Sequence, residues 1–310
     1  MNSTRQKPRQ FSAWLKAARP KTLPASTSGV LVGSALAYAD KHFDLFSALA
    51  AFFVALALQI ASNLANDVYD FESGADTNRT HGPLRVTSAG LLSPRQVKTG
   101  LLVVLLLASV VGVAVIMYSH QTAPGAWPWL SALGVFAIAA SIGYTTGPFP
   151  LAKLGLGDVF VLIFFGFAAT SGSYFLQTGT LKTAALLLSL GPGLIIVAIL
   201  VVNNLRDIPE DRVHHKRTLA VRFGERFAKI QYLLCLTLAY AVLLITVTIR
   251  LVSPWTLLVL LTLPLAFKNL RLIWSVRGSA LNAVLGGTGL LSFLWAFGFA
   301  LGILLSKAFP

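Results

Sequence analysis

The sequence predicts an all-α integral membrane protein, and three observations support this fold class. Hydrophobic residues make up 55% of the 310-residue chain and charged residues only 12%, well away from the soluble average. Apolar runs close to the ~20 residues needed to cross a bilayer recur along the chain, and basic residues gather on one side of them. Because backbone groups in lipid must be satisfied within their own segment, and no run alternates like a barrel strand, the runs are predicted to be helices.

About nine transmembrane helices are expected, forming one domain over residues 22–307 that follows a basic segment, residues 1–21. The predicted spans are approximately 22–39, 46–66, 99–118, 127–145, 158–176, 183–205, 227–249, 254–275 and 283–306.

The basic residues predict the orientation of these spans. With the N-terminus on one side, 21 of the 25 Lys and Arg residues fall on that side, so the positive-inside rule makes it cytoplasmic and places the C-terminus outside. Topology and attraction to anionic lipid thereby account for the net charge of +14, and a nucleic-acid partner is not needed. The oligomeric state is left open.

Acidic residues are concentrated at two places on the predicted cytoplasmic side. Seven of the eleven lie in the windows 67–76 and 207–211, at the start of long connections near 67–98 and 206–226 that are expected to cap the domain. Asn66 and Asp70 recur as Asn203 and Asp207 at the same offset of 137 residues, and Asp211 follows four residues later. We interpret the match as a trace of an internal repeat in which each half supplies part of one site.

The residue types in these windows favour a hard cation. All candidate ligands are oxygens, which suits magnesium, and magnesium in proteins is usually held by one or two carboxylates together with substrate phosphates. Arg79, Arg85, Arg206 and Lys216 lie nearby in sequence and are available to a phosphate group. The clusters therefore predict a magnesium-diphosphate site, with a pair of solvated, charge-mixed loops as the alternative.

Several strings resemble the UbiA superfamily of intramembrane prenyltransferases and, more narrowly, the 1,4-dihydroxy-2-naphthoate polyprenyltransferases of menaquinone synthesis. The strings are Arg19-Pro20-Lys21-Thr22-Leu23-Pro24, Ser62-Asn63-Leu64-Ala65-Asn66-Asp67, Gly82-Pro83-Leu84-Arg85, Gly155-Leu156-Gly157-Asp158 and Asn203-Asn204-Leu205-Arg206-Asp207.

The resemblance implies a ring of helices around a central cavity that opens into lipid. Its activity would be transfer of a polyprenyl group from a polyprenyl diphosphate to 1,4-dihydroxy-2-naphthoate, with loss of diphosphate and carbon dioxide, to give demethylmenaquinol. A bacterial inner-membrane location and magnesium dependence are implied as well. The residues expected to bind metal are Asn66, Asp70, Asp76, Asn203, Asp207 and Asp211, and the carboxylates expected to be catalytic are Asp67, Asp70, Asp207 and Asp211.

The first cluster departs from the usual family spacing. An acid is expected four residues after Asp70, where this chain has Gly74, and the next acid is Asp76. The naphthoate members resemble this longer spacing. Whether Asp67 or Asp76 is the closer ligand is left open.

Other residues have two interpretations each. Tyr144 would stabilise an allylic cation or anchor the interface, and Asp158 would assist deprotonation of a ring hydroxyl or cap its helix. Arg19, Lys21 and Lys153 would bind diphosphate or only follow the topology rule. The complete set expected to bind substrate is Asn63, Asn66, Arg79, Arg85, Lys153, Asn203, Arg206, Lys216, Arg19 and Lys21.

Two rival functions are considered. A cation-coupled secondary transporter would place charges in the middle of its spans, whereas here the spans carry almost none at that depth. A prenyltransferase for another acceptor, such as 4-hydroxybenzoate or a tetrapyrrole, is the alternative within the enzyme class.

Overall fold

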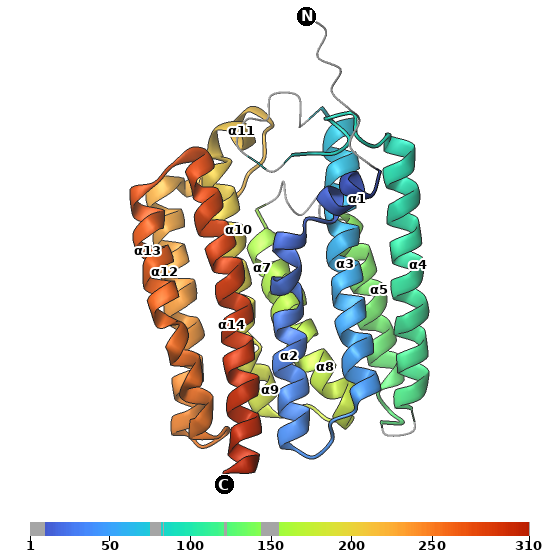
Figure 1. Cartoon of the computed structure of the whole chain (residues 1–310), viewed down its shortest axis with the longest axis vertical. Helices are drawn as coiled ribbons and strands as arrows, with labels where there is room; N and C mark the ends of the chain where they lie inside the picture. Colours follow the sequence, from blue (N-terminus) through green and yellow to red (C-terminus); the bar gives the residue numbers. More distant parts are fainter. Residues whose placement is uncertain (1–9, 75–81, 83, 121–122, 144–154, 310) are drawn as a thin grey trace, which may run out of the picture.

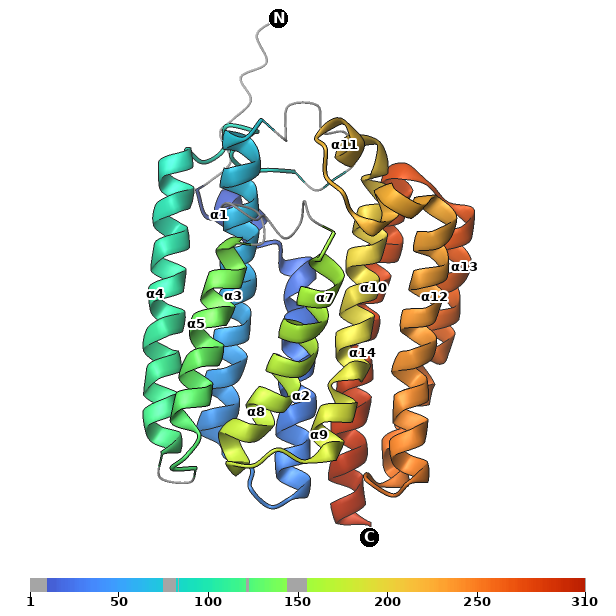
Figure 2. The same cartoon turned by 180° about the vertical axis from the view of Figure 1, so that it is seen from behind.

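The computed structural model of the chain describes residues 10–74, 82, 84–120, 123–143 and 155–309. All regular secondary structure in these residues is helical (Figures 1 and 2). In chain order the elements are α1 Gln10–Ala18, η1 Pro20–Thr22, α2 Leu23–Ala39, α3 Leu45–Glu72, α4 Pro94–Ser119, α5 Trp127–Gly143, α7 Gly157–Val161, η2 Leu162–Ala168, α8 Ala169–Thr178, α9 Thr183–Leu188, α10 Leu190–Arg206, α11 Ile208–Val213, α12 Leu219–Thr248, η3 Pro254–Thr262, α13 Leu263–Ser275, η4 Gly278–Ala280 and α14 Leu281–Ala308.

The predicted all-α membrane architecture is confirmed. Seven continuous helical segments within the described residues are long and apolar enough to cross a membrane. Two further helices, α2 and α5, each of 17 residues, run beside these seven segments between the same two ends of the bundle (Figures 1 and 2). Each of the nine predicted spans therefore corresponds to a helical segment, and the count of about nine is approximate because α2 and α5 are short.

The helix boundaries differ most from the expected spans next to the first acidic cluster. α3 continues to Glu72, so Asp67 and Asp70 lie on the helix and not in a loop. α4 begins earlier than expected, at Pro94, because Ser93 and Gln96 form a capping box in which each side chain accepts a hydrogen bond from the other residue's backbone N–H. The connection between α3 and α4 is thereby shortened to residues 73–93.

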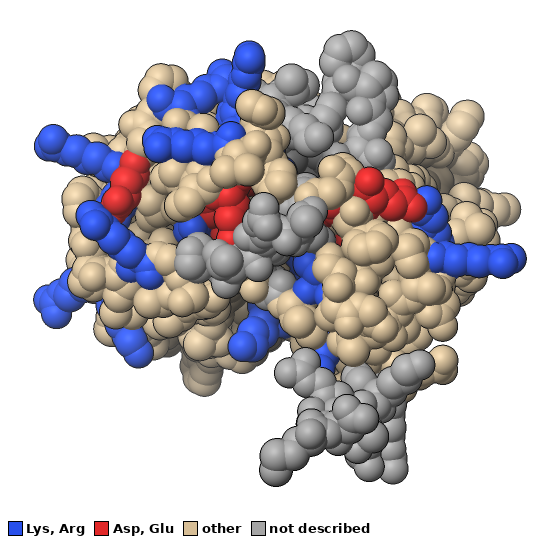
Figure 3. All heavy atoms as spheres, turned by 90° about the horizontal axis from the view of Figure 1, so that it is seen from above, with Lys and Arg blue, Asp and Glu red and all other residues tan. Residues whose placement is uncertain are grey.

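The two ends of the bundle differ in charge. We call the end where α3 and α10 finish and α12 begins the cluster end, because it carries both acidic clusters. Figure 3 looks onto this end and shows many Lys and Arg side chains, most of them on the side of α12 and α13. At the other end the described basic residues are Lys41, Lys182, Arg250 and Lys307.

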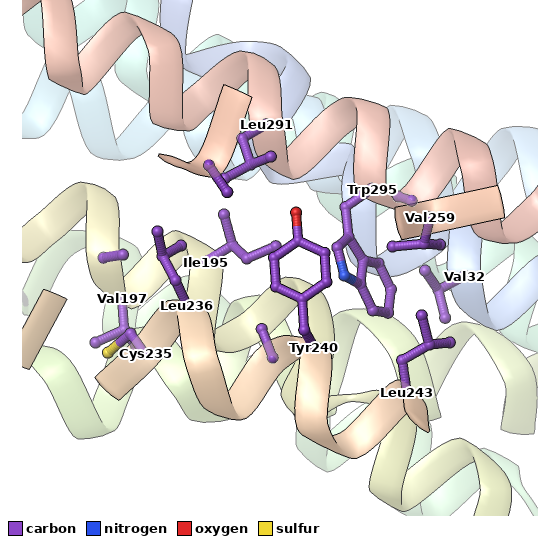
Figure 4. Close-up of a cluster of buried hydrophobic side chains, with 14 of the residues drawn as sticks. Val32, Ile195, Val197, Cys235, Leu236, Tyr240, Leu243, Val259, Leu291 and Trp295 are labelled. Carbon is purple, nitrogen blue, oxygen red and sulfur yellow. The ribbon is translucent and has the colours of Figure 1, made fainter. Parts of the chain in front are cut away.

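Packing within the bundle relies on small residues, as expected where lipid removes most of the hydrophobic force between helices. A Cβ on Gly29 of α2 would lie 2.7 Å from the Cβ of Ala169 on α8 and 2.7 Å from the backbone oxygen of Phe165 in η2, so α2 packs directly against the backbone of this span. The largest buried cluster joins α2, α10, α12, η3 and α14. Figure 4 shows its side chains between the helices, with the fully buried Trp295 among them. This half of the bundle is therefore closely packed.

Polar contacts join the helices at the end opposite the clusters. The Tyr174 hydroxyl donates a 2.5 Å hydrogen bond to Asp40, and Lys182 forms a 2.9 Å ion pair with the same carboxylate. Burial alone would raise the pKa of Asp40, but these two partners lower it below its usual value. The buried Gln177 accepts a hydrogen bond from the Asp44 N–H and donates one to Ser34. We call Ser34, Asp40, Asp44, Tyr174 and Gln177 the outer polar layer.

Candidate active site

A cavity of about 640 Å³ lies inside the bundle, walled chiefly by α2, α3, α4, α5, α7, η2, α8 and α10. Its polar and charged lining gathers near the cluster end, where Arg19, Lys21, Asn63, Asn66 and Asn203 contribute. Further from that end the lining is mostly apolar. At a rise of about 1.5 Å per residue, Ala51 and Asn66, which both line the cavity, are separated by roughly 22 Å along α3. The cavity is therefore deep, with a polar mouth and an apolar shaft.

Near the cluster end, the cavity-lining face of α3 carries amides and a serine and not the acids. Gln59, Ser62, Asn63 and Asn66 line the cavity. Asn63 also donates hydrogen bonds to the Ala18 carbonyl oxygen at 3.0 Å and to the Thr22 hydroxyl at 3.3 Å. Asn63 thereby fastens the segment between α1 and α2, which holds Arg19 and Lys21 at the cavity mouth. Arg19 takes a left-handed backbone conformation there, with φ of 51°, which is uncommon for a residue with a side chain.

The acids of the first cluster hold a turn of the following connection. Asp67 is only 1% exposed, and its two oxygens accept 2.9 Å hydrogen bonds from the N–H groups of Val86 and Thr87. Asp70 forms a buried 2.6 Å ion pair with Arg85 of the same turn. Both carboxylates, on one face of the last turns of α3, therefore dock residues 85–87 onto the helix. Neither is among the described residues that line the cavity.

The second cluster is organised by Arg206. This side chain is 2% exposed, and its Nε and Nη2 donate to the two oxygens of Asp207 at 2.6 and 2.7 Å. Nη2 also donates to Asn203 Oδ1, and Nη1 donates to Asn282 Oδ1 on α14, both at 2.6 Å. Arg206 was predicted to bind substrate, but its described donors hold the predicted metal ligands Asn203 and Asp207 in place.

Asp211 lies one turn further, on α11, which begins directly after Asp207 because the backbone leaves helical geometry at that residue. Asp211 is buried, and Lys216 lies 3.7 Å from its carboxylate. The predicted partnership of Lys216 with this cluster is thus consistent with the structure, although the roles assigned to both residues remain predictions.

Asp158 lies on α7 and accepts a 3.2 Å hydrogen bond from Gln231 Nε2 on α12. It is not among the described cavity-lining residues, and it lies in the first turn of α7. Tyr144, Lys153, Asp76 and Arg79 lie outside the described residues.

Two residues of this arrangement have contacts that the sequence did not predict, although Thr22 belongs to the string Arg19-Pro20-Lys21-Thr22-Leu23-Pro24. Asn282 follows Arg206 by 76 residues and is a single amide at the start of an apolar helix. Thr22 receives a hydrogen bond from Asn63 on a helix that is likewise distant in sequence. For both residues, the hydrogen bond forms because the helices pack together. The pattern of neighbouring residues in the sequence does not reveal such a contact.

The donor set fits a hard divalent cation supported by a phosphate ligand. Among the described residues no three His, Cys, Asp or Glu side chains are close enough to form a complete metal cage. Asp70, Asp207 and Asp211 offer carboxylates, and Asn66 and Asn203 offer amide oxygens beside the cavity mouth. An incomplete, all-oxygen set of this kind suits magnesium, which takes few protein ligands and completes its shell with water and substrate phosphate.

Residues 26–297 match the UbiA prenyltransferase family. The chain belongs to this family. The resemblance predicted from the sequence strings is therefore confirmed, and the family match covers every described residue of the two clusters.

The similarity to relatives within the UbiA family covers nearly the whole chain. The 1,4-dihydroxy-2-naphthoate octaprenyltransferase of Escherichia coli K12 is 39% identical over 306 residues, which are 98% of this chain and 99% of the relative. The protein of the same name from Haemophilus influenzae is 33% identical over 98% of this chain and 100% of its own.

Solved structures of the UbiA family share the fold. The apo structure of a UbiA homolog from Aeropyrum pernix K1 aligns with a TM-score of 0.64 at 15% identity, covering 93% of this chain and 99% of that one. A homolog from Archaeoglobus fulgidus, described as bound to DMAPP and Mg2+, aligns with a TM-score of 0.59 at 16% identity, covering 94% of this chain and 99% of that one.

Proposed function

We propose that this chain transfers a polyprenyl group from a polyprenyl diphosphate to 1,4-dihydroxy-2-naphthoate, releasing diphosphate and carbon dioxide and giving demethylmenaquinol. The observation that carries the proposal is the cavity, with a polar mouth beside both acidic clusters and an apolar shaft below it. A polyprenyl diphosphate has the same division, a charged head and a long apolar tail. The names of the relatives over nearly the full chain support the naphthoate acceptor.

The residues divide the work at the mouth as follows. Asn66, Asp70, Asn203, Asp207 and Asp211 would hold magnesium, and Asp76 remains a predicted ligand. Magnesium, when bound, offsets the negative charge of the departing diphosphate.

Cations of the chain have two separate tasks. Arg19 and Lys21 line the mouth and would contact the diphosphate directly, with Lys216 beside Asp211. Arg85 and Arg206 are tied to carboxylates and would position them. Asp67, which holds the 85–87 turn, would act as a positioning residue and not as a catalytic one.

The apolar shaft would hold the proximal part of the tail and keep water from the reacting carbon. Water would quench an allylic cation, so exclusion of water is a requirement of the chemistry. The excess of Lys and Arg at the cluster end supports a cytoplasmic location for the mouth in a bacterial inner membrane.

The test is a reconstituted reaction. Purified protein in lipid nanodiscs is incubated with magnesium, a polyprenyl diphosphate and either 1,4-dihydroxy-2-naphthoate or 4-hydroxybenzoate, and products are identified by mass spectrometry. Prenylated naphthoquinol and release of carbon dioxide are expected with the first acceptor. Product from the second acceptor alone would refute the naphthoate assignment, and no product from either, beside an active control enzyme, would refute prenyl transfer.

A further inference from the structure

The fifth span contains a π-helical segment. Between α7 and α8, residues Leu162–Ala168 follow π geometry and not α geometry. π-helical turns are rare and are frequently found at functional sites. This one forms part of the cavity wall, so its effect on that wall bears on the reaction.

The π-helical segment lies where the span touches α10 most closely. A Cβ on Gly166 would lie 2.8 Å from the Ser189 carbonyl oxygen and 3.1 Å from the Cα of Gly193. A Cβ on Gly193 would in turn lie 2.9 Å from Cδ1 of Leu162. The two backbones are therefore in direct contact at Gly166 and Gly193, with the Leu162 side chain packed beside them.

Another side of this span lines the cavity. Its lining residues are Phe160, Val161, Phe164, Phe165, Ala168 and Ala169, followed on α8 by Gly172, Ser173 and Leu176. The π-helical segment itself contributes Phe164, Phe165 and Ala168 to the cavity wall.

This face carries all of the aromatic residues among the described lining of the cavity, namely Phe160, Phe164 and Phe165. The Phe160 and Phe164 rings are stacked, with centroids 6.3 Å apart and an interplanar angle of 25°. Phe160 is three residues from the start of α7 at the cluster end, and α10, which packs against this span, brings Asn203 to the same end. The phenyl rings thus lie below the polar mouth.

We propose that Phe160, Phe164 and Phe165 bind the allylic end of the donor and stabilise the positive charge that develops on it. The proposal rests on the proposed function. In the step concerned, the bond between the allylic carbon and the diphosphate oxygen breaks, and both electrons leave with the oxygen. An electron pair of the acceptor ring then forms the new carbon–carbon bond, and loss of carbon dioxide leaves its bonding pair in the ring.

Phenylalanine suits this position for two reasons. The face of an aromatic ring attracts a cation, and the attraction is larger in a site without water. Phenylalanine also has no lone pair, so it neither captures the allylic cation nor removes a proton from it. A tyrosine or serine at the same place would offer an oxygen that does both.

The experiment replaces each phenylalanine singly by leucine, with Phe167→Leu as the matched control. Phe167 belongs to the same π-helical segment but is not among the described cavity-lining residues. Besides kcat, binding is measured for two unreactive analogues of equal chain length: a prenyl ammonium ion with inorganic diphosphate, and a neutral-chain prenyl thiodiphosphate.

At least one of the three cavity variants is expected to lose about 10-fold in kcat and about 10-fold in affinity for the ammonium ion, with little change in affinity for the thiodiphosphate. Phe167→Leu is expected to change none of these values. Equal losses for both analogues, or normal kcat and ammonium binding in all three variants, would overturn the proposal. If the wild-type chain makes no prenylated product, the proposed function fails, and the analogue measurements still decide the role of the rings.

Discussion

Arg206 and Asn282 join the second acidic cluster to the last helix of the bundle. Arg206 Nη1 donates a 2.6 Å hydrogen bond to Asn282 Oδ1, while Nε and Nη2 of the same guanidinium hold the two oxygens of Asp207. A guanidinium has five donors in one plane, so fixing Nη1 on α14 fixes the plane in which Asp207 is held. Asn282 therefore acts on the predicted metal ligand Asp207 indirectly, through the side chain of Arg206.

Asn282→Ala is expected to raise the magnesium concentration for half-maximal rate by about 10- to 100-fold, because residues that orient metal ligands contribute on this scale. Binding of manganese, followed by electron paramagnetic resonance, should weaken by a similar factor in the absence of substrates. The Asn282→Asp variant retains an acceptor oxygen for Arg206 and should recover most of the affinity.

Asn269→Ala is the control for this prediction. Asn269 is a buried amide on α13 that lies against Gly287 of α14, away from Arg206 in the described contacts. Its removal should leave manganese affinity unchanged. Equal weakening in the two alanine variants would show that a general loosening of α14, and not the bond to Arg206, is responsible.

Asp70→Asn and Asp207→Asn are each expected to lower kcat by on the order of 100-fold or more, since each removes a predicted metal ligand. Asparagine is preferred over alanine because it leaves a hydrogen-bond acceptor for the buried Arg85 or Arg206. Alanine would leave that arginine without its acceptor, at a cost of about 3–5 kcal/mol of stability. Glu72→Gln is the control: Glu72 ends the same helix but is exposed and paired with Lys98. Near-normal turnover in both asparagine variants, with membrane insertion verified, would contradict the metal site.

Asp67→Asn is expected to loosen the connection between α3 and α4 more than it affects metal binding or prenyl transfer. An amide can accept from only one of the two N–H groups of Val86 and Thr87, so amide hydrogen exchange in residues 84–90 should accelerate and thermal stability should fall. Manganese affinity without substrate should change less than about threefold, unlike the values for Asn282→Ala. A loss of manganese binding as large as in Asp207→Asn, with unchanged exchange, would instead make Asp67 a metal ligand.

Gly193→Ala is expected to destabilise the protein by about 1–3 kcal/mol, the usual cost of overpacking. Its added methyl group would meet the Cα of Gly166 at 2.7 Å. Gly112 on α4 is the matched control, because a Cβ there has no neighbour within 4 Å among the described residues. Thermal unfolding in detergent should show a clear decrease for Gly193→Ala and almost none for Gly112→Ala. Equal stability of the two variants would contradict the close contact between the π-helical segment and α10.

The sequence predicted the parts of this protein that follow from local pattern. Apolar runs located the helical segments because a bilayer imposes length and composition on each segment separately. The pairing of Asn66 with Asn203 and of Asp70 with Asp207 was visible as a common offset.

The sequence could not predict which partner each side chain of the clusters would choose. Asp67 and Asp70 share a helix face with Asn63, yet only the amides line the cavity, because a turn 15 to 20 residues further on occupies the carboxylates. The π-helical segment also escaped prediction. It coincides with the contact between Gly166 and Gly193, which belong to different helices, and the run of apolar residues around Gly166 is equally compatible with an α-helix.

The outer polar layer has a consequence for the cell's energy supply. A deep cavity with a charged mouth would conduct ions if it were open at both ends. Each elementary charge crossing a membrane at 100 mV dissipates about 2.3 kcal/mol. Asp40, Tyr174 and Gln177 are absent from the described cavity lining and instead bind one another's helices across the end opposite the mouth. The layer lies between the cavity and the opposite face of the membrane, and a cavity without an aqueous path to that face would leave the proton gradient intact.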